Sequence, residues 1–296
     1  LLLCVAGSAV AQSKSWTAVQ KTVNPSANIV FGANLKPIRA TSTYAAGLQM
    51  LLQEEDDAKE AFDMIKSACG IDVPMAIADV TVIMKEDEKP LVVFGLDGLD
   101  ETKVVTCLEK VGAQASGKAD LKISRKKVGK LTEYSIPGER KKLYAAWLAP
   151  DVIAFTDDPS DKGKLTKALA GRAPKGVVAQ GLAKVATSAP IWAVVSKKEK
   201  ESVGTILGGY GQVDISGGTV SVSAHVIWSK PGEASAALAD VQNGLVEAKA
   251  EAAKMPAVLK VLNTVTLGTT GKELDIKGSV ADADIVGLLP QLDKIF

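Results

Sequence analysis

Hydrophobic and polar positions follow their most regular pattern in the segment 80–112. Two short runs rich in Val and Ile, Val80–Met84 and Leu91–Gly95, flank a charged stretch, a pattern that predicts a β-hairpin. Asp100 then stands where a helix N-cap belongs, and apolar residues recur at helical spacing up to Gly112. The segment is therefore predicted to form two antiparallel strands followed by a helix.

The same strand–strand–helix order returns later in the chain. Tyr210–Ile215 and Thr219–Trp228 flank a Ser-Gly-Gly turn, and in the second run apolar residues alternate with Ser and His. Such alternation predicts one buried and one solvated face. Pro231 then opens a long helix. The repetition indicates an internal duplication, with a first α+β repeat over residues 12–171 and a second over 172–296.

Strands that arrive as hairpins favour antiparallel sheets with segregated helices. The expected fold class is therefore α+β, with two similar halves. Each half is expected to be an antiparallel sheet with helices packed on one face.

The first eleven residues are uncharged and end in Ala9-Val10-Ala11. An apolar run that closes on small residues in an A-x-A pattern is typical of a secretory signal peptide. We therefore interpret residues 1–11 as a signal peptide remnant and expect the exported protein to begin at Gln12, which places it in the periplasm or outside the cell. A buried N-terminal element is the plain alternative, and a lipoprotein signal would instead use Cys4.

Composition narrows the classes of partner. Lys and Arg number 35 against 34 for Asp and Glu, and aromatic residues make up only 4% of the chain. Neither value favours nucleic-acid binding, which uses basic surfaces and stacking aromatics. After residue 11 no stretch approaches the 18 or so consecutive apolar residues of a membrane span, so none is expected. No glycine-rich loop has phosphate-binding spacing between a strand and a helix.

Two cysteines remain if Cys4 is removed on export. Cys69 and Cys107 both fall on predicted helices beside apolar positions. An even number of cysteines in an exported chain is what a single disulfide requires. Two separate buried thiols are the alternative, and export favours the disulfide.

No catalytic or metal-binding constellation stands out. His225 is the only histidine, on a strand face beside serines, and no motif provides a nucleophile or an orienting carboxylate for it. A single histidine also argues against a histidine-based zinc site. Asp157, Asp158 and Asp161 could contact a calcium ion, but the first two stand where helix caps belong and no loop of alternating ligands is present. Capping is therefore favoured, and Asp282 and Asp284 are interpreted in the same way. We expect no catalytic residue, metal or cofactor.

One stretch of about 25 residues is unusually basic and is predicted to form hairpins. Its basic residues are Lys118, Lys122, Arg125, Lys126, Lys127, Lys130, Arg140, Lys141 and Lys142. Clustered positive charge can attract an anionic partner. Lysines also protect an edge strand from aggregation, and that plainer explanation stays open.

Several local patterns resemble a family of uncharacterised exported proteins from myxobacteria and related Gram-negative bacteria. They are the N-x-V-F-G-x-N-L strand within Pro25–Ala40, the Cys69-Gly70-Ile71-Asp72 step, the Val92–Leu108 strand and helix, and Ala189-Pro190-Ile191-Trp192. The resemblance implies a duplicated, exported α+β protein with one disulfide. It implies no activity.

The leading hypothesis is an exported, non-catalytic binding or scaffold protein of the cell envelope, with an unknown ligand. Its expected partner is an anionic envelope component or another envelope protein. The alternative is an extracytoplasmic hydrolase whose carboxylates meet only in the fold. A structural repeat protein without a small ligand is the third class.

Overall fold

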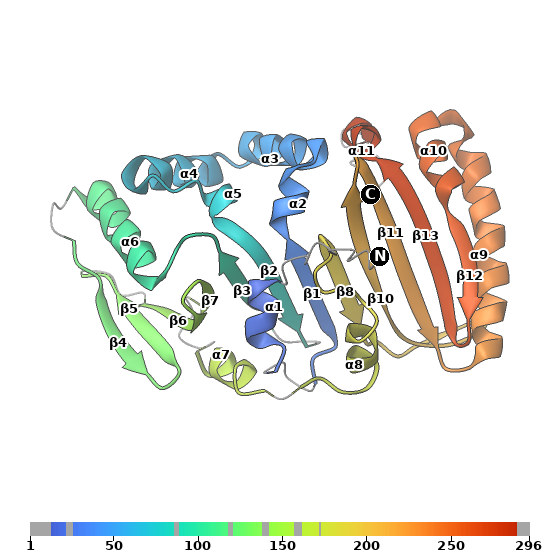
Figure 1. Cartoon of the computed structure of the whole chain (residues 1–296), viewed down its shortest axis with the longest axis horizontal. Helices are drawn as coiled ribbons and strands as arrows, with labels where there is room; N and C mark the ends of the chain where they lie inside the picture. The colour runs from blue at the N-terminus through green and yellow to red at the C-terminus, as the bar shows by residue number, and fades with distance from the viewer. Residues whose placement is uncertain are drawn as a thin grey trace, which may run out of the picture.

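A computed structural model describes residues 13–21, 26–85, 89–117, 121–137, 142–156, 162–171 and 173–288. These residues form one antiparallel sheet of 13 strands. Helices lie on both faces, and α3 and α4 lie along one row of strand ends (Figure 1). The α+β class and the antiparallel pairing are thus confirmed. No helix in the described ranges has both the length and the apolar character that crossing a membrane requires.

The first half contains seven strands and seven helices within the described ranges. Its strands are β1 (Ile29–Asn34), β2 (Ile77–Met84), β3 (Leu91–Leu96), β4 (Ser124–Val128), β5 (Leu131–Ser135), β6 (Lys142–Ala149) and β7 (Val152–Thr156). Its helices are α1 (Lys14–Val19), α2 (Leu35–Arg39), α3 (Ser42–Glu54), α4 (Asp56–Cys69), α5 (Val73–Ala76), α6 (Glu101–Ser116) and α7 (Lys162–Ala168).

The second half contains the remaining elements. Its strands are β8 (Ile191–Val195), β9 (Glu199–Glu201), β10 (Gly204–Ser216), β11 (Thr219–Trp228), β12 (Thr266–Thr270) and β13 (Glu273–Ala281). Its helices are α8 (Gly176–Leu182), α9 (Pro231–Glu251), the short 3₁₀ turn η1 (Ala252–Lys254), α10 (Pro256–Thr264) and α11 (Asp282–Leu288).

The two halves join edge to edge at the centre of the sheet. The strand order is β12-β13-β11-β10-β8-β1-β2-β3-β7-β6-β5-β4, and β9 pairs with β10 beside this path. Outward from the central β1–β8 pair, the first half runs through β1, the β2–β3 hairpin, β7 and β6. The second half runs through β8, the β10–β11 hairpin, β13 and β12. The first half then continues into β5 and β4. The shared order supports the predicted duplication, and superposition of the halves stays a prediction.

Register assigns the helices to faces, because directly opposed residues in antiparallel strands point to the same side. Thr81, which α1 contacts through Ser15, shares a face with Trp192 and Val194 beside α8. The long helices α6 and α9 lie on the opposite face, where α9 packs on Val226. The expectation of helices on one face therefore holds for α6 and α9, while the short α1 and α8 cover the other.

The central core lies under α1 and α8. Trp192 is fully buried and meets Trp16 of α1 edge-on, with ring centroids 5.2 Å apart. Its indole lies directly over Gly32 of β1, where an added Cβ would come within 2.3 Å of the ring. Glycine is therefore the residue that lets this tryptophan lie flat on the sheet. Separate clusters form between the sheet and α6, and between the sheet and α9.

The end of one helix differs from the sequence expectation. The helix after Asp100 continues past Gly112 and ends at Gly117, which has the left-handed conformation of a C-cap. Gly112 packs against Leu121 instead. The segment after β1 forms two helices, α2 and α3, because Thr41 caps the second by accepting a hydrogen bond from the Tyr44 N–H.

Asp282 was expected to cap the last helix, but it caps a helix of the other half. Its buried carboxylate accepts hydrogen bonds from the Ser42 N–H at 2.5 Å and from the Thr43 N–H at 3.1 Å. The Thr43 hydroxyl donates a third at 2.6 Å. This side chain therefore links the start of α11 to the start of α3.

Replacing Asp282 with Ala should lower the free energy of unfolding by about 1–2 kcal/mol, the range of a lost helix cap. Burial raises the pKa of the Asp282 carboxyl, but the hydrogen bonds from Thr43 and Ser42 outweigh burial and hold this pKa below its usual range. The stabilisation is then fully present above the ordinary aspartate pKa and is lost as pH falls through the lower folded-state value. Urea unfolding of both proteins at pH 7 and pH 3 should show the difference shrinking in acid. An unchanged difference would contradict this role.

Candidate functional site

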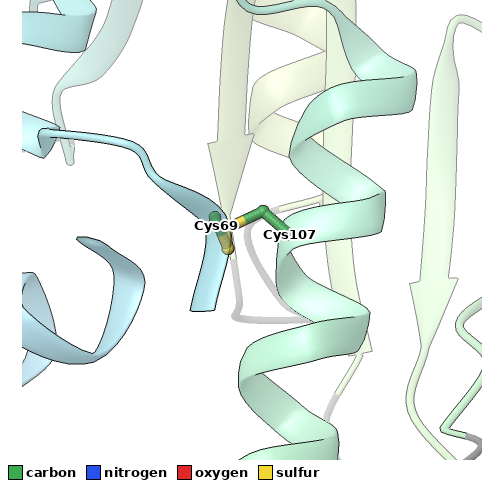
Figure 2. The surroundings of a disulfide bond; sticks show 2 residues. All are labelled: Cys69 and Cys107. Atoms are coloured by element: carbon green, nitrogen blue, oxygen red, sulfur yellow. A yellow bond between two sulfur atoms is a disulfide. The ribbon is translucent and has the colours of Figure 1, made fainter. Parts of the chain in front are cut away.

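The predicted disulfide is present. Cys69 at the end of α4 is bonded to Cys107 in the second turn of α6, across a sequence separation of 38 residues (Figure 2). The bond joins α4 to a helix that packs on the sheet.

The basic stretch forms the outermost hairpin of the sheet. β4 is the end strand and pairs only with β5 among the described strands. Ser124, Arg125, Lys126 and Lys127 are all exposed, and Lys130 lies in the turn between the two strands. Lys118, Arg140 and Lys141 lie outside the described residues. The remaining predicted residues, Lys122 and Lys142, flank the hairpin.

Strand alternation divides these charges between the two faces. Arg125 opposes the buried Tyr134 and therefore points toward the α6 face, together with Glu109 of α6. Glu109 accepts a hydrogen bond from the Ile123 N–H, and this bond, reinforced by Lys122 at 3.4 Å, lowers the pKa of the Glu109 carboxyl. Two of the charged groups on this face therefore neutralise each other.

The other face carries a second ion pair. Lys126 opposes Glu133, whose carboxylate contacts the Lys142 ammonium at 2.7 Å. The hydrogen bond from Lys142 lowers the pKa of the Glu133 carboxyl and raises that of Lys142. Arg125, Lys126, Lys127 and Lys130 form no ion pair with any described residue. The hairpin therefore keeps an excess of positive charge.

A second polar cluster surrounds His225, in the other half of the sheet. His225 on β11 directly opposes Tyr210 on β10 and Asp275 on β13. Its Nδ1 lies 2.7 Å from Asp275 Oδ1, and its ring stacks on Tyr210 with centroids 4.5 Å apart. Glu273, two residues before Asp275, faces the same side. We call His225, Tyr210, Glu273 and Asp275 the His225 cluster.

Hydrogen bonds hold both carboxylates of the cluster. The Tyr210 hydroxyl donates to Glu273 Oε2 at 2.8 Å, and the Thr270 hydroxyl donates to Asp275 Oδ2 at 2.7 Å. Burial raises the pKa of the Asp275 carboxyl, but the bonds from Thr270 and His225 outweigh it and leave the pKa lowered. Burial and the bond to Glu273 raise the pKa of Tyr210. The Lys184 ammonium pairs with the remaining oxygen of Glu273.

Two glycines allow the backbone to approach closely beside the His225 cluster. Gly181 of α8 lies against β8 and β10, where an added Cβ would come within 2.5 Å of Val194 and 3.2 Å of the Tyr210 Cβ. Close approach of α8 places Lys184, which follows the helix, above the Tyr210 ring at 5.6 Å. Gly209 passes the His225 carbonyl at a distance that leaves no room for a Cβ.

Two hollows lie on the described part of the surface, and neither assembles paired carboxylates. One of about 420 Å³ is lined by serines of β11 and β13 together with Asp214 and Lys277. Another of about 210 Å³ beside α10 and α11 contains Asp284. Each has a single carboxylate, so neither provides the arrangement that the hydrolase alternative requires.

Comparison with known proteins gives a likeness in structure only. No family model and no curated protein matches the chain. Crystal form III of TP0453 matches with a TM-score of 0.50 over 91% of this chain and 96% of that one, at 9% identity. Crystal forms I and IV give TM-scores of 0.48 and 0.46, also at 9% identity, over 92% and 94% of this chain and 96% and 99% of theirs. The likeness shows the fold alone.

Sequence reasoning identified the disulfide and the basic hairpin but missed the His225 cluster. The partners of His225 lie about 50 residues away on β13 and 15 residues back on β10. Glu273 and Asp275 are spaced two apart on one strand, the spacing that places both on one face. The sequence therefore indicates that the two carboxylates share a face. Only the register of β11 against β13 shows that this face includes the histidine.

Proposed function

We propose that the protein is an exported, non-catalytic binding protein of the cell envelope, and that it contacts an anionic partner through the β4–β5 hairpin. The observation that carries the proposal is the excess of unpaired positive charge on this exposed sheet end. The A-x-A ending at Ala11 and the disulfide both support export, since disulfides persist in oxidising compartments.

The charge balance argues for a contact surface in addition to edge protection. Four basic side chains of the hairpin form no ion pair with a described carboxylate, whereas the whole chain has a net charge of only +1. A local concentration of charge in a nearly neutral chain attracts anions by its summed field. Because Arg125 and Lys126 point to opposite faces, the partner should contact the β4 edge of the sheet rather than one face.

Reversing the charges at the hairpin should abolish binding to anionic surfaces. The variant is Arg125→Glu, Lys126→Glu and Lys127→Glu, tested by co-sedimentation with vesicles rich in an anionic phospholipid and by retention on a sulfated polysaccharide. Wild-type binding should fall steeply between 50 and 300 mM salt, because the Debye length is about 8 Å at physiological ionic strength. The variant should lose at least about tenfold in affinity, because six units of charge change at the contact.

A matched control reverses three exposed lysines elsewhere. Lys197→Glu, Lys198→Glu and Lys200→Glu, beside β9 on the second half, change the net charge equally. This control should retain most of the binding, and both variants should melt near the wild-type temperature. Equal losses in both variants, or binding that ignores salt, would leave the hairpin lysines as edge protection alone. Binding to only one of the two probes would identify the partner as lipid or polysaccharide.

A further inference from the structure

The geometry points to a binding site for a divalent transition-metal ion, with Zn²⁺ as the best fit, formed by His225, Glu273 and Asp275. The site is independent of the proposed envelope contact. It lies on β11 and β13 of the second half, far from β4 in the strand order. A single histidine and two disulfide-bonded cysteines do not predict a zinc site, but the fold brings two carboxylates to the one histidine.

The donor atoms are already close together. One ligand atom from each of His225, Glu273 and Asp275 lies within 4.8 Å of the other two. Donors around a tetrahedral Zn²⁺ at bond lengths of about 2.1 Å stand about 3.4 Å apart. Small side-chain rotations would therefore complete the site without moving the backbone. One imidazole and two carboxylates suit zinc, whereas calcium and magnesium prefer oxygen ligands alone.

Each carboxylate is oriented as in a prepared metal site. A hydroxyl holds one oxygen, Thr270 on Asp275 and Tyr210 on Glu273, while the other oxygen faces a nitrogen. Hydrogen bonds of this kind fix ligand orientation around protein metal centres. The side chains of His225, Glu273 and Asp275 are only 15–21% exposed. The ligands are thus partly withdrawn from water but still reachable from it.

A positive group competes with the metal for one of the three ligands. The Lys184 ammonium pairs with Glu273 and lies over the Tyr210 ring. Lys277, the next residue on the same face of β13, adds positive charge that acts on Asp275. Zn²⁺ would replace the Lys184 ion pair and the hydrogen bond between His225 and Asp275. Lys184 is exposed enough to turn away, with 47% of its side chain accessible.

The test is titration of tag-free protein with Zn²⁺ alone, followed by calorimetry and by NMR of the imidazole nitrogens. Because the chain has one histidine, its nitrogen signals report this site without assignment. We expect one Zn²⁺ per chain and a shift of the signals on binding. His225→Gln and Asp275→Asn should each weaken binding at least tenfold, while Lys184→Gln should tighten it by removing the competing cation.

The control variant is Asp214→Asn, which removes one exposed carboxylate from the same solvent-facing part of the sheet. It should bind Zn²⁺ like the wild type, and Ca²⁺ should not displace the zinc. Circular dichroism of each variant checks that it is folded. Three results would each overturn the site: no binding at 1 mM Zn²⁺, unshifted histidine signals, or equal affinity in wild type and the His225→Gln and Asp275→Asn variants.

Discussion

Replacing Asp79 with Ala should destabilise the protein by about 3 kcal/mol or more, because four hydrogen-bond donors of the N-terminal segment would lose a buried anionic acceptor. Asp79 of β2 is 3% exposed. Its carboxylate accepts from the Ser13 hydroxyl at 2.8 Å, the Lys14 N–H at 3.0 Å, the Ser15 N–H at 2.8 Å and the Ser15 hydroxyl. This one side chain therefore anchors the start of α1 to the sheet.

The loss should extend to the central core, because α1 carries Trp16 and Val19 into it. Urea unfolding measures the change, and limited proteolysis should show earlier cleavage near residues 13–21. Asp63→Ala is the control, since Asp63 is exposed and pairs with Lys59 at the surface, where ion pairs contribute little to stability. A similar loss in both variants would contradict the anchoring role. Asp79→Asn should fall between them, because the amide keeps one acceptor oxygen.

Local signals in the sequence predicted individual helices and strands, but they did not predict which distant strands pair in the sheet. The hairpin of β2 and β3 and the Asp100 cap appear where the pattern placed them. Each depends on neighbours within a few residues. Pairing between β1 and β8 joins segments about 160 residues apart, and no periodicity of either strand encodes its partner.

Because local patterns do not encode long-range contacts, the structural roles of some individual residues also differ from those that their sequence context indicates. Asp282 has the sequence context of a cap for its own helix, yet its carboxylate reaches the N–H groups of α3. Gly208, Gly209 and Gly211 look like a turn before a strand. They instead lie inside β10, beside a bulge between Ile206 and Gly208. A carbonyl of β8 at Gly208 and carbonyls of β11 at Gly209 and Gly211 leave no space for side chains. Turn residues are ambiguous because bulges and close backbone approach also require glycine.

The second large effect concerns the disulfide. Replacing Cys69 and Cys107 with Ala should cost up to about 4 kcal/mol, the loop-entropy value for a loop of this length. The helices α3 and α4 contain no fully buried residue, so few apolar contacts would hold them once the bond is gone. We therefore expect the loss to appear first as local opening of this helical pair.

Hydrogen exchange followed by mass spectrometry can separate local opening from global destabilisation. In the Cys69→Ala, Cys107→Ala variant, amides of residues 42–70 should exchange at least about a hundredfold faster, since opening would no longer be limited by the bond. Amides of β1, β2 and β8 should change much less, because these strands lie in the Trp192 core. Reduction of the wild type should reproduce the pattern. Uniform acceleration across the sheet would show instead that the disulfide stabilises the whole fold, and no acceleration in residues 42–70 would show that packing against α6 and α11 holds the helices without it.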